Sequence, residues 1–346
     1  MDMIKNKPFL TDEKVDDFTA EDFVFVHRNE ELLDEAYTAT SYAKDVWMHF
    51  KKNKGAVFGA IIIIAIILLA IIGPMISGYK ADAINLDVQS LPPRIQGIYK
   101  LGIFSGYEKG VDQYAAHGVS QAFYWFGTDT NGRDLFTRVW EGTRVSLIIA
   151  LSAVVIDIVI GMSYGLISGY FGGKVDMVMQ RFMEILNGIP TLVVVTLLGL
   201  VLPPGITSIV FALMITGWIG MARISRAEVL KLKESEFILA SRTLGAKNFS
   251  IIFKEVMPNI FGQLIVMSMF SIPNAIFTEA FLSFVGLGIQ APDASLGSLI
   301  SDGYKSLTGH PHIIMSAIIV LALLMLSFNL FADGIRDAFD PNQKQR

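Results

Sequence analysis

An uncharged run at residues 55–79, GAVFGAIIIIAIILLAIIGPMISGY, constrains the fold of this chain more than any other feature. At ~1.5 Å per residue, roughly 20 helical residues cross the ~30 Å hydrocarbon core of a bilayer. The mostly polar residues 1–54 precede the run, without the early apolar region and small-residue cleavage site of a removable signal peptide. The run is therefore predicted to stay in the membrane as an anchor.

Four further apolar stretches predict five more membrane spans. They are residues 145–171, 185–222, 258–290 and 313–332. LPPG at 202–205 interrupts the second stretch, and paired prolines followed by glycine break a helix, so this stretch forms two spans. The composition, with 52% hydrophobic and 17% charged residues, fits an all-α polytopic membrane protein with six transmembrane helices better than a soluble domain.

Lysine and arginine residues in the short flanking segments predict the orientation of these spans. They fall on one side, before span one, between spans two and three, between four and five, and after span six. These residues are Lys51, Lys52, Lys54, Lys174, Arg181, the seven Lys and Arg within 223–254, Arg336, Lys344 and Arg346. The positive-inside rule then makes this side cytoplasmic and the long loop between helices 1 and 2 external.

The chain is accordingly expected to have five parts. They are a cytoplasmic N-terminal segment at 1–54, transmembrane helix 1 at 55–76, an external lobe at 77–143, a core of helices 2–6 at 144–332 with a cytoplasmic loop at 223–258, and a cytoplasmic tail at 333–346. Within the first part, residues 41–53 begin with a possible N-cap, Ser41, and place Val46, Trp47 and Phe50 on one helical face. They are either an interfacial elbow helix or the cytoplasmic end of span one.

Several functions are excluded or disfavoured by what the sequence lacks. The net charge of −4 and the scattered basic residues do not indicate nucleic-acid binding. The chain has no cysteine, which excludes disulfides and thiolate metal sites. No GxxxxGK[ST] phosphate loop occurs, since GGKVD at 172–176 lacks its first glycine and its Ser/Thr. No metal site is predicted, and His310 and His312 are expected to cap the outer end of span six.

The polar segment RAEVLKLKESEFILASRTLGAKNFSIIFKEVMPN, at 226–259, interrupts the apolar chain. Ser235 is a candidate N-cap of a short helix that stops at Gly245, and Asn248 or Ser250 can cap a second helix, which Pro258 kinks. The residues alone leave two interpretations open, an amphipathic connector on the lipid headgroups and a docking element for a cytoplasmic protein. A DNA-reading helix-turn-helix is disfavoured because membrane spans hold both ends.

This segment resembles the cytoplasmic EAA loop of ABC importer permeases, which docks on the ATPase. The match lies at Ala240, Gly245 and Pro258. The chain departs from the family pattern at Leu239, Ser241, Glu255 and Met257. The resemblance implies ATPase-coupling roles for Glu236, Phe237, Ala240, Ser241, Leu244, Gly245, Ala246 and Pro258.

Three more segments are similar to the oligopeptide and dipeptide permease family, so that the resemblance covers residues 51–341. They are 126–147, 278–303 and 329–341, the last with Ala332-Asp333 where the family usually has Gly-Asp. The first contains a family motif before helix 2, formed by Gly127, Thr128, Asp129, Gly132, Arg133 and Asp134. A calcium loop at these residues is disfavoured, because the EF-hand order of ligands is absent.

The resemblance implies a type I ABC importer permease fold in the bacterial cytoplasmic membrane. Such a chain pairs with a homologous second permease and two separate ATPase subunits, and an external substrate-binding lipoprotein delivers the peptide. ATP and Mg²⁺ would be held by the ATPase subunits, so no cofactor is expected on this chain, which is not itself an enzyme. Gly245 would permit the sharp turn that keeps the docking helix short.

Asp157 and Glu279 are possible pathway residues, because ionisable groups within spans are costly and normally face protein or a water-filled cavity. The alternative is that each side chain hydrogen-bonds to neighbouring helices or is protonated. The same two carboxylates motivate a second functional class, an ion-coupled secondary transporter or channel. An intramembrane hydrolase is disfavoured, since no nucleophile and base pair across the predicted spans.

Overall fold

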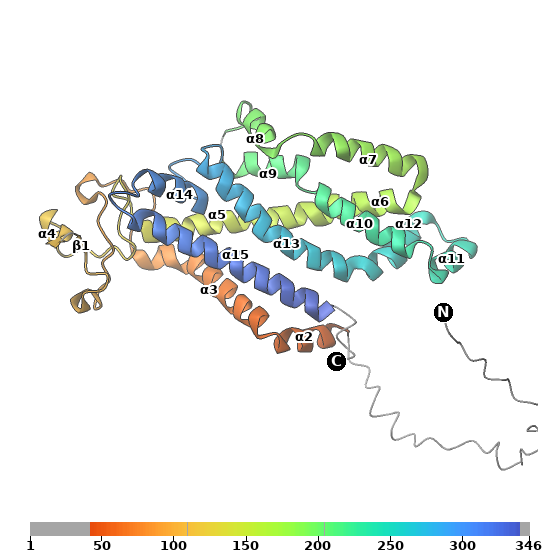
Figure 1. The fold of residues 1–346 in the computed structure, drawn as a ribbon, viewed down its shortest axis with the longest axis horizontal. Helices are drawn as coiled ribbons and strands as arrows, with labels where there is room; N and C mark the ends of the chain where they lie inside the picture. The colour runs from red at the N-terminus through yellow and green to blue at the C-terminus, as the bar shows by residue number, and fades with distance from the viewer. Residues whose placement is uncertain (1–41, 109, 204, 340–346) are drawn as a thin grey trace, which may run out of the picture. The chain divides into compact units, whose positions relative to one another are not determined.

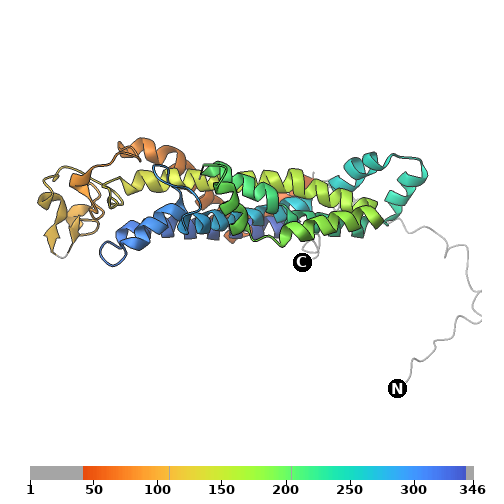
Figure 2. The same ribbon diagram turned by 90° about the horizontal axis from the view of Figure 1, so that it is seen from above.

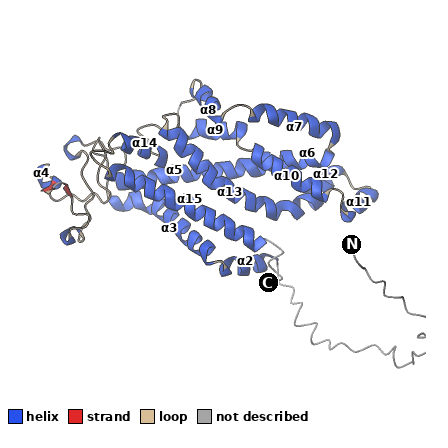
Figure 3. Ribbon diagram, in the orientation of Figure 1, coloured by secondary structure: helices blue, strands red, loops and turns tan. Residues whose placement is uncertain are grey.

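The computed structural model describes residues 42–108, 110–203 and 205–339, and they are mostly helical (Figure 1, Figure 3). By its internal contacts the chain divides into a unit of residues 1–45 and a larger unit of residues 46–346. All the elements from α3 to α15 belong to the larger unit.

Within the described part of this unit, five helices are long and apolar enough to cross a membrane. The first and last are α3 (Lys54–Ser77) and α15 (His312–Phe339). The second, Leu135–Phe171, is formed by α5 (Leu135–Ile156), η5 (Asp157–Met162) and α6 (Ser163–Phe171). The next, Ile206–Leu232, contains α9 (Ile206–Thr216) and α10 (Ile219–Leu232). The span Asn248–Phe284 contains α12 (Asn248–Ile251), η6 (Ile252–Val256) and α13 (Met257–Phe284). Both η5 and η6 are π-helical.

The sixth predicted span is a bent pair, α7 (Gly173–Asn187) and α8 (Thr191–Gly199), which meet at 72°. Counting this pair as one span gives the six helices that the sequence predicts. Its beginning was predicted wrongly, because Lys174 and Arg181 lie within α7 and not in a connecting loop. Gly172, with φ +63°, makes the turn that lets α7 start directly after α6.

The segment between α3 and α5 folds as a small lobe with its own core. It contains η3 (Leu86–Val88), η4 (Tyr99–Leu101), the antiparallel strands β1 (Tyr107–Glu108) and β2 (Val111–Asp112), and α4 (Gln113–Ala116). Val88, Leu91, Tyr114 and Tyr124 are buried together in it. The following helix already begins at Leu135, before the predicted end of the lobe at residue 143. In Figures 1 and 2 the lobe and the short helix α11 (Glu236–Thr243) lie at opposite ends of the helical bundle.

A stripe of glycines brings the second span onto α10. Gly161, Gly165 and Gly169 are spaced by four residues and therefore share one helical face. A Cβ on Gly165 would lie 2.3 Å from the carbonyl oxygen of Ala222. Such close backbone approach stabilises helix pairs in lipid, where no hydrophobic drive favours association. The η5–α6 half of the span and α10 therefore pack as one unit.

An ion pair adds α7 to this unit. Asp176 Oδ1 and Oδ2 accept from Arg226 Nε and Nη2 of α10, both at 2.6 Å. The hydroxyl of Ser168, on α6, also donates to Asp176. The bidentate geometry fixes the angle between α7 and α10, and charge-assisted bonds of this kind are stronger than neutral ones.

The N-terminal helix α2 (Tyr42–Lys52) precedes α3. Trp47 stacks on Phe50, which is buried against Phe331 of α15 with ring centroids 5.5 Å apart. Asn53 separates the two helices, because its side chain accepts from Ala56 N and caps α3. The proposed cap Ser41 lies outside the described residues.

Candidate functional site: the α11 segment and the Asp157 pocket

The α11 segment has the predicted helix, turn and second helix. Gly245 has φ +84°, so it makes the left-handed turn that stops the first helix. Ser235 occupies the N-cap position, but its hydroxyl donates to Leu232 O at 2.6 Å and does not cap the helix. The second helix is α12, whose N-cap is Lys247, so the predicted caps Asn248 and Ser250 were wrong.

Helix α11 is held by one buried side chain. Ile238 is its only buried residue, and it joins a cluster that includes Leu166 of α6, Val229 of α10 and Ile251 of α12. In contrast, Phe237 is 43% exposed and Leu244 is 88% exposed. The segment therefore combines a firm anchor towards the bundle with an apolar outer surface.

The other residues singled out in this segment divide between these two sides. Glu236, Ala240 and Gly245 are exposed, whereas Ser241 is half-buried and Ala246 packs against the Ile238 cluster. Pro258 is exposed and is the second residue of α13. The π-helical segment η6 ends at Val256, two residues before Pro258, and the helix Asn248–Phe284 runs through as one span.

The motif before α5 forms the joint between this helix and the lobe. Asp134 is the N-cap of α5, and its Oδ2 accepts from Thr137 N at 2.9 Å. Asp129 accepts from Arg133 Nε at 2.7 Å and lies 3.6 Å from Arg138 Nε. Thr128 Oγ1 accepts from Leu91 N at 2.8 Å, which fixes the chain to the lobe core.

Both glycines of this joint are required by its geometry. Gly127 has φ +81° and Gly132 has φ +71°. A Cβ on Gly132 would lie 1.8 Å from Asn85 O, and a Cβ on Gly127 would lie 2.3 Å from Leu91 O. The motif thus holds the lobe to the bundle, and Asp129 forms ion pairs with Arg133 and Arg138.

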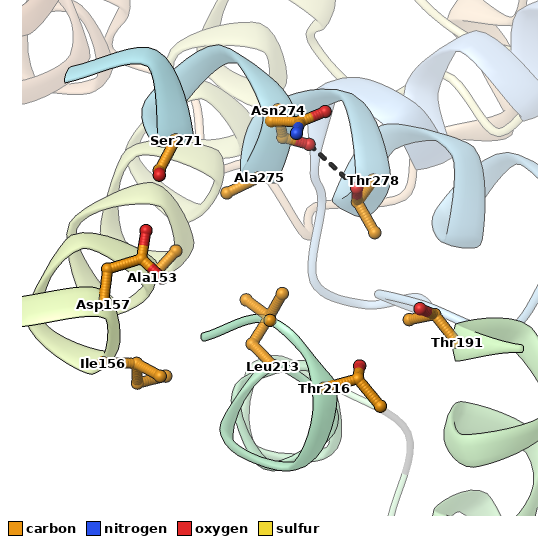
Figure 4. A pocket seen from close by; sticks show the side chains of 11 residues that line it. Ala153, Ile156, Asp157, Thr191, Leu213, Thr216, Ser271, Asn274, Ala275 and Thr278 are labelled. Atoms are coloured by element: carbon orange, nitrogen blue, oxygen red, sulfur yellow. Dashed lines mark hydrogen bonds between the residues drawn. The ribbon is translucent and has the colours of Figure 1, made fainter. Parts of the chain in front are cut away.

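Asp157 lines a pocket of about 150 Å³ between four helices (Figure 4). Its lining comes from the second span, α8, α9 and α13, and includes Ala153, Ile156, Asp157, Thr191, Leu213, Thr216, Ser271, Asn274 and Thr278. Asp157 is the first residue of η5 and is only 5% exposed. The hydroxyl of Ser271 faces it (Figure 4). The sequence identified Asp157 but not its polar neighbours, which come together only in the folded chain.

Glu279 has a different environment. It is fully buried in α13 and does not line the Asp157 pocket. Its Oε2 accepts from Ser146 Oγ at 2.6 Å, and its Oε1 accepts from Ser283 Oγ at 2.8 Å. These contacts fit the alternative role, a hydrogen-bonded link between α5 and α13.

Sequence reasoning missed two features of this region. One is the glycine stripe Gly161, Gly165 and Gly169, although its spacing of four within an apolar span is a visible signal for close helix packing. The other is the Asp176–Arg226 pair, whose partners are fifty residues apart and carry no sequence signal for each other.

Five long apolar helices and one bent pair, with a lobe at one end of the bundle and the short helix α11 at the other, define a polytopic α-helical membrane protein of the permease type in the part of the chain that the structure describes. Residues 161–345 match the family model described as binding-protein-dependent transport system inner membrane component. Residues 41–93 match the N-terminal TM domain of oligopeptide transport permease C. The chain therefore belongs to the family of binding-protein-dependent transport system inner membrane components.

Curated relatives match over almost the whole chain. The dipeptide transport system permease protein DppC of Bacillus subtilis is 41% identical over 319 residues, which cover 92% of this chain and 91% of the relative. The oligopeptide transport system permease protein OppC of Bacillus subtilis is 42% identical, over 87% of this chain and 90% of the relative. DppC of Lactococcus lactis is 45% identical, over 90% and 93%.

These findings confirm the predicted resemblance and the predicted fold class. The family is that of ABC importer permeases, and the relatives are named as permease proteins. The chain is thus a multi-pass membrane permease subunit and not the ATPase of its transporter.

Proposed function

We propose that this permease subunit carries dipeptides or oligopeptides into the cell as part of an ATP-driven importer. The observation that carries the proposal is the identity of 41–45% with permeases named for dipeptide and oligopeptide transport, over about nine-tenths of each chain. The lobe, the bundle and the α11 segment each have a part in such a machine.

The partners follow from this assignment. A homologous second permease completes the pathway, two ATPase subunits bind ATP and Mg²⁺ at the α11 end, and an external binding protein delivers peptide at the lobe end. The orientation with both termini in the cytoplasm belongs to the same proposal. It is supported by the positions of α11 and the lobe at opposite ends of the bundle (Figure 1) and by the distribution of Lys and Arg.

Coupling to ATP is assigned to the α11 segment. Phe237, Ala240 and Leu244 present small and apolar groups outward, which suits a groove on a partner protein. Ile238 transmits a displacement inward, because its cluster joins α6, α10 and α12. Closure of the ATPases on ATP would then move the spans on both sides of α11 together and alternate access to the pathway.

Ala240→Arg tests this role without disturbing the fold, since Ala240 is exposed. We expect peptide uptake to be abolished, while the subunit still inserts in the membrane, because a bulky charge blocks close docking of a helix. Gly245→Pro is expected to act in the same way by removing the left-handed turn. Ala227→Arg, an equal change at an exposed position of α10, is the matched control and is expected to transport normally.

Uptake by Ala240→Arg at the wild-type rate would refute the coupling role. The assignment as a whole is tested by purifying the chain and asking whether ATPase subunits copurify. Peptide uptake that stops on ATP depletion but survives loss of the ion gradient supports it. The reverse dependence would identify an ion-coupled transporter instead.

A further inference from the structure

Asp157 is the single charged side chain among the described residues that line its pocket. Its other polar lining consists of hydroxyl and amide groups, from Thr191, Thr216, Ser271, Asn274 and Thr278. None of the described residues in the lining is Lys, Arg or His. Among the described residues, the ion pairs of the chain do not include Asp157. A carboxylate withdrawn from water inside a span without a cation is unfavourable, so the pocket favours a positively charged occupant.

Comparison with Glu279 shows that burial alone does not produce such a site. Glu279 accepts from Ser283 one turn away on α13 and from Ser146 on α5, and it is sealed from solvent. Asp157 instead borders open volume, where a ligand can reach it. Of the two carboxyl groups, only that of Asp157 is placed to bind something that enters and leaves.

The threonine hydroxyls of the pocket are oriented as acceptors. Thr216 Oγ1 donates to Ala212 O at 3.3 Å, and Thr278 Oγ1 donates to Asn274 O at 2.8 Å. Each hydroxyl hydrogen is thereby used within its own helix, as the dashed line in Figure 4 shows for Thr278. The lone pairs of both oxygens remain available to a donor. A carboxylate together with such oxygens matches an ammonium group, which has three donors and no acceptor.

We propose that the pocket between Asp157, Thr216, Ser271 and Thr278 binds the α-ammonium group of the transported peptide. This inference rests on the proposed function as a peptide importer. A volume of about 150 Å³ is smaller than the ~300 Å³ at which pockets begin to hold drug-sized ligands, so it accommodates the end of a peptide and not its length. Peptides of every sequence share this amino end. One carboxylate therefore recognises the class without selecting side chains.

The absence of cysteine from the chain allows a direct test in the assembled transporter. Thr216→Cys places the chain's single thiol in the pocket. Mass spectrometry of the permease chain measures how fast this thiol reacts with aminoethyl (cationic) and with sulfonatoethyl (anionic) methanethiosulfonate. The ratio of the cationic to the anionic rate is divided by the same ratio for free cysteine. The carboxylate is expected to raise this relative ratio by about tenfold, because a charged cleft concentrates counter-ions.

Asp157→Asn in the same background is expected to remove that preference. Glu184→Gln, which neutralises an exposed carboxylate of α7, is the matched control and is expected to leave it unchanged. A dipeptide with a free amino end is expected to slow the modification, whereas its N-acetylated form does not. No charge preference, a preference that survives Asp157→Asn, or a thiol that reacts with neither reagent would overturn the proposal.

Protection by sodium or ammonium chloride equal to that by the dipeptide, at the same concentration, would assign the pocket to small cations and also overturn it. In uptake assays, Asp157→Asn is expected to lower transport of the free dipeptide by about tenfold, and Asp157→Glu is expected to restore most of it. If the charge preference, the protection by dipeptide and the uptake changes are all absent, but the transporter still imports peptides with ATP, the ammonium site is refuted and the proposed function is not. Wild-type protein that imports no peptide refutes the proposed function.

Discussion

Replacement of Ile238 by alanine tests how α11 is held to the bundle. Ile238 is the one buried residue of α11, and every other residue of the helix is exposed or half-buried. Its side chain occupies a cluster with residues of α6, α10 and α12. The substitution leaves the outer surface of α11 unchanged and removes only the inward contact.

The size of the effect follows from the atoms removed. Ile→Ala deletes three carbon atoms, worth about 2.4 kcal/mol at ~0.8 kcal/mol per buried methylene. The cavity left behind raises the cost to as much as about 4 kcal/mol. In the undocked state, α11 is detached from the bundle and the side chain at 238 is exposed. Since ~1.4 kcal/mol changes an equilibrium constant tenfold, the substitution makes this state roughly 50 to 1,000 times more populated. Transport should fall, because motion of α11 would no longer reach the spans.

Hydrogen exchange of the amides at 236–243, measured on the purified permease, reports this local release. We expect faster exchange there by a similar factor, with unchanged exchange in α3 and α15. Ile64→Ala makes the same chemical change at an exposed position of α3 and should leave exchange in α11 unaltered. Unchanged exchange at 236–243 in Ile238→Ala would refute the view that this side chain anchors the helix.

Two further predictions concern glycines. Gly165→Ala is expected to lower the thermal unfolding midpoint of the purified protein, because its Cβ would meet the Ala222 carbonyl oxygen at 2.3 Å, whereas Gly220→Ala, with open space around it, should not. Equal midpoints would contradict the proposed close packing. Gly132→Ala is expected to loosen the lobe and increase its cleavage by added protease, because its Cβ would overlap a backbone carbonyl. Gly110→Ala, which has a similar positive φ but no such clash, should have the smaller effect, and equal cleavage would argue against the joint.

The spans could be predicted because lipid leaves a chain few choices. An uncharged run such as that of α3 has to form a helix, since unpaired backbone groups are too costly in hydrocarbon. The start of the third span was missed because α7 carries Lys174, Asp176, Arg181 and Glu184, which resemble a polar loop. Its residues are nevertheless helical, and Asp176 pairs with a distant arginine that the local sequence does not reveal.

The α11 segment was predictable for a similar local reason. A glycine after an amphipathic stretch favours a left-handed stop, and Gly245 has that conformation. The cap of α12 was not predictable, because the Oδ1 of Asn248 instead accepts a hydrogen bond from the hydroxyl of Tyr170. The pocket illustrates the general limit. Asp157 was identifiable as a charge within a span, but its partners Thr191, Thr216 and Ser271 lie on three other helices.

The two π-helical turns have a consequence for the rotational phase of their helices. A π turn accommodates an extra residue, and one residue corresponds to ~100° of α-helical rotation. The side chains before and after η6 are therefore out of step, so α12 can face α11 while α13 faces α5 and α15. Deleting one residue from Ile252–Val256 would bring the two halves back into step and turn α12 away from Ile238. One continuous helix thus serves two sets of neighbours that a single 3.6-residue period could not align.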